Sequence, residues 1–166
     1  MMSFARISAL TALAAALAAA PAAAQDLGIE VGQTAPAVTV QSLDGKSVNL
    51  GSYIGKTPML IEFWATWCPN CKELMPTLLD VEKKYSKQVK FVAIAVAINQ
   101  SPEKVRRFLA AHPLPHDTYY DVEGGAAGAF DAPATSYVVV LDKNGKVVYT
   151  GLGGKQDLEA AVRKAL

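Results

Sequence analysis

Cysteine and histidine are scarce in this chain of 166 residues, and neither basic nor acidic residues dominate. Two cysteines, Cys68 and Cys71, cannot build the multi-bridge framework of a small disulfide-rich domain. The chain has 16 basic and 15 acidic residues, and one basic residue, Arg6, lies in residues 1–24. The remainder is therefore neutral overall. We expect no nucleic-acid partner and no polybasic membrane contact, since both require a basic surface. The length fits one domain with a short appendage.

The N-terminus predicts an export signal over residues 1–24. Arg6 precedes an apolar run of 14 residues at 7–20, Pro21 ends that run, and small residues follow at 22–24. The run is shorter than the roughly 20 residues that span a bilayer. An uncleaved anchor and a buried Ala-rich helix are the alternatives. With a cleaved signal the protein is expected in the periplasm, where disulfides persist.

The rest of the chain predicts a lead-in at 25–35 and an α/β domain at 36–166, because apolar strands alternate with amphipathic helices. The expected architecture is a mixed sheet covered by helices, preceded by an N-terminal β-hairpin. The expected strands and turns are a hairpin at 36–51, strands at 59–64, 89–98 and 137–141, and a turn at 142–145 leading into a strand at 146–150. The expected helices begin near Cys68, with Pro76 inside, and at Ser101, with further helices at 124–130 and 156–166.

The two cysteines stand where the strand 59–64 turns into a helix. Two residues between them place their Cα atoms about one helical turn apart, which suits a disulfide. Cys68 would meet unpaired N–H groups and the positive end of the helix dipole, which lowers a thiol pKa and favours the thiolate. Thiolate is the nucleophile of disulfide exchange. We expect Cys68 to attack and Cys71, shielded inside the helix, to resolve the mixed disulfide.

Other interpretations of the cysteine pair have less support. A structural zinc site needs four ligands, and only His112 and His116 could complete one, far along the chain and next to prolines. Covalent haem attachment needs histidine directly after the second cysteine, where Lys72 stands. An inert disulfide remains open, although so short a loop constrains little entropy. We expect no metal site, and both histidines to be loop residues.

The stretch from Met59 to Lys72 (MLIEFWATWCPNCK), followed by Pro76, resembles the active site of the thioredoxin superfamily. The residue sequence of this stretch is most similar to that of the exported TlpA/ResA-type thiol–disulfide oxidoreductases. The resemblance covers nearly all of residues 30–166. Further matching features are Gly32–Pro36, the Asp44–Lys46 turn, Gly55–Lys56, Asp121, Phe130 and the Asp142–Gly145 turn.

This resemblance implies roles for individual residues. Cys68 would be the nucleophile and Cys71 the resolving thiol, with Trp67 and Pro69 on the surface that meets the substrate. Glu62 stands six residues before Cys68, where cytoplasmic thioredoxins carry a buried acid. Burial would raise its pKa and allow proton exchange with Cys71; a structural acid is the alternative.

Two positions depart from the family pattern. Many ResA-type proteins carry Glu three residues after the second cysteine, whereas this chain has Leu74 there and Glu73 one position earlier. The cis-proline position of the family aligns with Ser136, preceded by Thr135, and Pro133 lies three residues too early. We expect Ser136 to face the dithiol, with its hydroxyl bonding a thiolate or a substrate backbone. An insertion that moves Pro133 into place, and a plain strand-start role for Ser136, are the alternatives. Pro133, Thr135 and Ser136 are all predicted to bind substrate.

The resulting functional hypothesis is an exported thiol–disulfide oxidoreductase acting on cysteine pairs of other exported proteins and needing no cofactor. The resemblance implies maturation of cytochrome c or of an oxidase, or wider redox homeostasis, with reducing power from a membrane thiol protein of the DsbD/CcdA kind. We expect a monomer. One alternative is a copper-handling metallochaperone that holds Cu(I) between Cys68 and Cys71. Another is a binding module whose dithiol is incidental.

Overall fold

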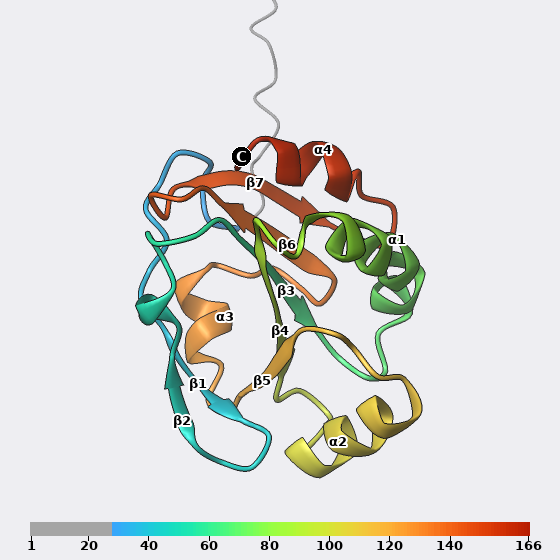
Figure 1. Cartoon of the computed structure of the whole chain (residues 1–166). Coiled ribbons are helices and arrows are strands. Elements are labelled where there is room, and N and C mark those ends of the chain that lie inside the picture. The colour runs from blue at the N-terminus through green and yellow to red at the C-terminus, as the bar shows by residue number, and fades with distance from the viewer. Residues whose placement is uncertain (1–27) are drawn as a thin grey trace, which may run out of the picture.

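The computed structural model describes residues 28–166; the predicted signal peptide and the first three lead-in residues lie outside this range. Figure 1 shows its helices and strands. The strands are β1 (Thr39–Ser42), β2 (Ser47–Asn49), β3 (Met59–Trp64), β4 (Lys90–Val96), β5 (Asp117–Asp121), β6 (Tyr137–Leu141) and β7 (Val147–Leu152). The helices are the 3₁₀ turn η1 (Leu50–Ser52), α1 (Pro69–Tyr85), α2 (Pro102–Ala111), α3 (Gly125–Ala129) and α4 (Leu158–Arg163). Within residues 28–166 no helix combines the length and apolarity needed to cross a bilayer.

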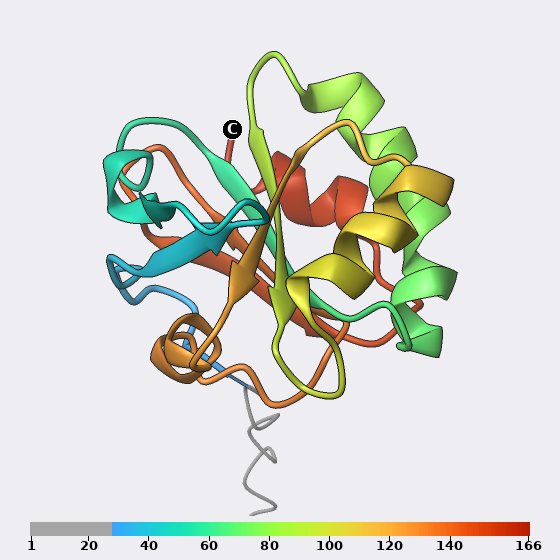
Figure 2. The ribbon, with the colours of Figure 1, turned by 90° about the horizontal axis from the view of Figure 1, so that it is seen from below.

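One mixed sheet of seven strands organises the domain, in the order β2-β1-β5-β4-β3-β6-β7. The three central strands β5, β4 and β3 are parallel, and the outer strands pair antiparallel. Parallel neighbours need crossover helices, which α1 and α2 supply. Figure 2 shows α1, α2 and α4 on one side of the sheet and α3 on the other. The predicted thioredoxin-like α/β fold and its N-terminal strand pair are confirmed.

The central strand β3 is buried along its whole length. Because side chains alternate along a strand, Leu60 and Glu62 share one face while Ile61 and Phe63 share the other. Leu60 packs in a cluster with Leu74 of α1 and with α4. Glu62 therefore lies on the face of the sheet that α1 covers.

Local capping chemistry fixes where the helices begin. Cys68 is the N-cap of α1 with Pro69 in its first turn, and Ser101 caps α2 with Pro102 in the same role. The bounds of β3 and the cap at Ser101 agree with the sequence prediction. Helix α4 is shorter than predicted at both ends, and its start is fixed by the Asp157 side chain, which accepts from the Ala160 N–H.

The segment predicted as a lead-in is attached to the domain as far as it is described. Ile29 and Ala35 are buried, and the Gly32 N–H donates to the Val147 carbonyl. Strand β5 at 117–121 is not among the predicted strands, and it forms because β4 and β1 pair with it on both sides. A backbone that completes a ladder overrides weak local preference.

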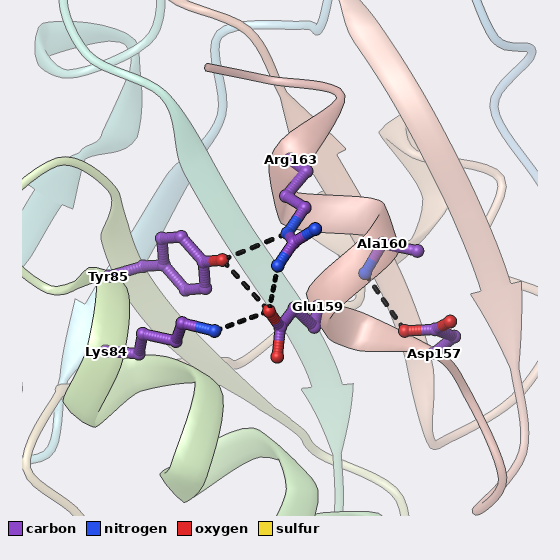
Figure 3. Close-up of polar contacts among 6 residues, drawn as sticks. All are labelled: Lys84, Tyr85, Asp157, Glu159, Ala160 and Arg163. Atoms are coloured by element: carbon purple, nitrogen blue, oxygen red, sulfur yellow. Dashed lines mark hydrogen bonds and ion pairs between the residues drawn. The ribbon is translucent and has the colours of Figure 1, made fainter.

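Helix α4 is held against the end of α1 by a buried leucine and by a cluster of polar contacts, which Figure 3 shows. Glu159 Oε1 accepts from Lys84 Nζ at 2.5 Å, from Arg163 Nη2 at 2.6 Å and from the Tyr85 hydroxyl at 3.2 Å. Leu158, next to it, is fully buried in the cluster that contains Leu74.

These neighbours should differ sharply in their contribution to stability. Leu158→Ala should lower the free energy of unfolding by about 2–5 kcal/mol, because it leaves a cavity in a packed core. Glu159→Gln should lower it much less, since exposed ion pairs are screened by water. Urea unfolding of both variants measures the difference. Equal losses would contradict this division between core and surface.

Candidate active site

Cys68 and Cys71 form a disulfide at the start of α1, directly after the turn that ends β3. Their Cα atoms are 5.3 Å apart, within the range expected for one helical turn. The Cys71 N–H donates to Cys68 Sγ at 3.0 Å, so the cap of the helix is the sulfur itself. A thiolate at Cys68 in the reduced protein would meet the same N–H and the positive end of the helix dipole.

The disulfide is buried while its chain neighbours are exposed. Cys68 and Cys71 are each 2% exposed, whereas Trp67 is 41% exposed and Pro69 and Asn70 are also on the surface. Exposure in the oxidised state does not distinguish the two cysteines, although Cys71 alone was expected to be shielded. Their positions in the chain distinguish them. Cys68 lies between exposed residues, and Cys71 lies one turn before the fully buried Leu74.

Glu62 is a carboxyl group in the centre of the sheet. It is 5% exposed, with Ala93 of β4 and Val138 of β6 beside it in register. Burial raises its pKa from 4.5 to about 8. Its Oε1 atom has no hydrogen-bond partner within residues 28–166. The Glu62 carboxyl group, which changes its protonation state near pH 8, thus lies on the sheet face under α1, the helix that carries Cys71.

Ser136 holds together the loop that faces the end of β3. No peptide bond in residues 28–166 is cis, and Ser136 has a φ of 63°, in the left-handed region. Its N–H donates to the Phe63 carbonyl at 2.8 Å, and its hydroxyl donates to the Gly153 carbonyl at 3.1 Å. Gln156 Nε2 donates to the Ser136 carbonyl. In the disulfide form the Ser136 hydroxyl donates to the Gly153 carbonyl and Ser136 is fully buried, so the bond to a thiolate or a substrate stays a prediction.

A groove opens next to these loops, with a cavity volume of about 380 Å³. Pro133 and Thr135 line it together with Ile98, which follows β4, and Val122 and Glu123, which follow β5. Ile98 is 61% and Val122 is 44% exposed, so the groove has two solvent-exposed apolar side chains in its lining. The sequence analysis missed Ile98, Val122 and Glu123. For Ile98 the available signal was its position at the carboxyl end of the predicted strand 89–98, since ligands bind at such ends in open α/β sheets; Val122 and Glu123 had no such signal, because β5 was not predicted.

The histidines weighed as metal ligands have other partners. His116 Nδ1 lies 2.7 Å from Glu82 Oε2, and both side chains are buried. His116 is a loop residue, as predicted, and its contact with Glu82 anchors the segment before β5 to α1. The His112 ring is exposed and stacks on Phe108. Within the described residues no three His, Cys, Asp or Glu side chains are grouped as metal ligands.

Comparisons with known proteins agree on the family. The Redoxin family model matches residues 30–166. The chain is 31% identical over 140 residues to thioredoxin-like protein YneN of Bacillus subtilis, covering 81% of this chain and 80% of that protein. It is 29% identical over 133 residues to thiol-disulfide oxidoreductase ResA of Geobacillus thermodenitrificans, covering 79% and 75% of the two chains.

A solved structure matches the fold. The crystal structure of a chain described as thiol:disulfide interchange protein DsbE from Chlorobium tepidum superposes with a TM-score of 0.73 at 24% identity, covering 82% of this chain and 98% of that one. Proteins of this kind carry electrons in the cysteine pair itself and need no cofactor. The chain therefore belongs to the Redoxin family, as a thioredoxin-like thiol–disulfide oxidoreductase of the ResA/TlpA type.

Proposed function

We propose that this enzyme works outside the cytoplasm, in the periplasm, on cysteine pairs of other exported proteins, with Cys68 as the attacking sulfur. The observation that carries the proposal is the disulfide at the N-terminus of α1, where the Cys71 N–H meets Cys68 Sγ. Export is supported by the residue pattern at 1–24. Both sulfurs belong to one helical turn, so exchange needs no movement of separate elements.

In the reducing direction the Cys68 thiolate attacks one sulfur of a substrate disulfide. The substrate disulfide breaks, its other sulfur leaves as a thiolate, and a mixed disulfide joins Cys68 to the substrate. Cys71 then loses its proton, which Glu62 accepts in the fraction of molecules whose carboxyl group is ionised, a fraction that grows as pH approaches about 8, and Cys71 attacks Cys68 Sγ. The second substrate thiolate leaves, and two electrons have passed to the substrate. The oxidising direction is the reverse of these steps.

The substrate-facing surface consists of exposed residues around the disulfide and the adjoining groove. Trp67 and Pro69 lie beside the sulfurs, and Pro133 and Thr135 line the groove. Ser136 is buried and acts indirectly, because its hydrogen bonds to Phe63 and Gly153 fix the backbone next to Thr135. We therefore assign Ser136 a positioning role in substrate binding.

The partners follow from the chemistry of the compartment. A dithiol that reduces substrates in an oxidising compartment needs a donor, and a membrane thiol protein of the DsbD/CcdA kind supplies that chemistry. Cysteine pairs of cytochrome c and of oxidase subunits are the proposed targets, and the enzyme acts as a monomer. Redox titration against glutathione sets the direction: about −270 mV corresponds to a reductant and about −120 mV to an oxidant.

Cys71→Ser should trap the mixed disulfide, because the resolving thiol is missing while Cys68 still attacks. The reduced variant, incubated with a periplasmic extract, should give adducts on non-reducing gels that dithiothreitol releases, with the linkage at Cys68 by mass spectrometry. Cys68→Ser, which keeps Cys71, is the matched control and should give none. No adduct from Cys71→Ser, or equal adducts from both variants, would count against exchange through Cys68.

Glu62→Gln should remove a pH-dependent cost to stability. Below about pH 4.5 Glu62 is protonated in both the folded and unfolded states, so its titration contributes nothing. Between pH 4.5 and about 8 the unfolded chain ionises while the folded protein keeps the proton, so the folded state loses relative stability as pH rises.

The free energy of unfolding of the oxidised wild-type protein should therefore decrease relative to that of Glu62→Gln across this window. At about 1.4 kcal/mol per pKa unit, the difference should reach up to roughly 5 kcal/mol at pH 8. Urea unfolding of both proteins from pH 4.5 to 8.5 measures the difference. A difference that stays constant with pH would mean that Glu62 titrates as an ordinary carboxyl group.

A further inference from the structure

The side chain of Gln100 joins the active-site turn to the end of β4. Its Oε1 atom accepts from the Thr66 N–H at 2.9 Å, and its Nε2 atom donates to the Val96 carbonyl at 2.6 Å. Thr66 and Val96 are each 7% exposed, so water has little access to either backbone group. No motif in the sequence pointed to Gln100.

The Gln100 side-chain amide takes the place of a backbone hydrogen bond between β3 and β4. The parallel ladder of β3 and β4 ends at the pair Trp64 and Ala95. Immediately beyond it, one side-chain amide bridges the Thr66 N–H and the Val96 carbonyl on the side where the β3–β4 ladder has ended, while Val96 stays in register with Asp121 of β5. The bridge lets the chain leave the sheet toward Cys68 while both buried groups keep their hydrogen bonds.

The loop that carries Gln100 is itself anchored. The Tyr120 hydroxyl of β5 donates to the Gln100 carbonyl at 2.7 Å. Asn99 has a φ of 54°, in the left-handed region, and Lys104 Nζ donates to its carbonyl at 3.3 Å. The amide is therefore presented from a fixed backbone.

The same loop also holds the tryptophan next to the nucleophile. Trp67 Nε1 donates to the Ile98 carbonyl at 2.7 Å, and the Cys68 N–H donates to the Ala65 carbonyl at 3.1 Å. The turn between β3 and α1 is thus fixed at Thr66 and at Trp67, the two residues before Cys68. A shift of this turn would move Cys68 Sγ away from the Cys71 N–H.

We propose that Gln100 is a positioning residue for thiol–disulfide exchange, acting through the Thr66–Trp67 turn on Cys68. Its amide keeps the attacking sulfur at the N-terminus of α1 and the Trp67 ring beside it. Without the amide, two buried backbone groups lose their partner, the turn relaxes, and the thiolate loses the N–H that favours it.

Gln100→Met tests this role, because methionine has a similar length and makes neither hydrogen bond. The probe is single-turnover attack of the reduced protein on the disulfide reagent DTNB, followed at 412 nm from pH 4 to 9. The rate constant should fall about tenfold at neutral pH, as small displacements of reacting atoms cost large factors. The pH of half-maximal rate should shift upward.

Gln100→Glu is the second variant, should Gln100→Met fail to fold. It keeps the acceptor for Thr66 but at neutral pH has no donor for Val96, so its rate should lie between those of the wild type and Gln100→Met. Tyr85→Phe, which weakens the α1–α4 contact far from the disulfide, is the control for lost stability. It should keep the wild-type rate and pH profile.

Two results would overturn the proposal. One is a folded Gln100→Met, or Gln100→Glu in its place, with a rate within twofold of wild type and an unmoved pH profile. The other is an equal loss of rate in Tyr85→Phe, which would mean that Gln100 affects the rate only through the overall stability of the fold. Proteins that all fail to react with DTNB would instead point to failure of the cysteine chemistry itself.

Discussion

The N-terminus of α1 is the constraint on which the rest of the active site depends. Cys68 is at once the cap of this helix and one half of the disulfide, and the Cys71 N–H meets its sulfur. Position and reactivity are therefore set by one geometry, because the groups that start the helix also favour a thiolate. The fully buried strand β3 brings the chain to this corner, and the hydrogen bonds of the Ala97–Gln100 loop hold the turn in place.

The domain tolerates unfavourable features around this corner. Glu62 is a carboxyl group without full hydrogen bonding in the centre of a sheet, and Ser136 adopts a left-handed backbone that only a few residue types enter readily. Both cost stability, and both lie on the elements that surround the cysteines. Such costs persist where surrounding structure fixes them, and they cluster at functional sites. The core on both faces of the sheet supplies the stability that offsets them.

Local signals in the sequence predicted most of the framework. The apolar run at Met59–Trp64 predicted β3 with its observed bounds, and Ser101-Pro102 predicted the start of α2. The cysteine spacing and its neighbours identified the reactive corner. Features that depend on distant partners were beyond such signals. The burial of His116 requires Glu82, which lies 34 residues earlier, and the hydroxyl of Ser136 is directed by Gly153. The bridge made by Gln100 exists only once β3 and β4 lie side by side.

The central claim is that the two sulfurs, equally buried in the disulfide, become unequal once reduced. Pulse alkylation of the reduced protein with iodoacetamide at pH 7, read by peptide mass spectrometry, tests it directly. The account predicts that position 68 is labelled first, and faster than an ordinary free thiol such as glutathione, while position 71 stays unlabelled. Labelling of both positions at the same rate, or of position 68 no faster than glutathione, would contradict it.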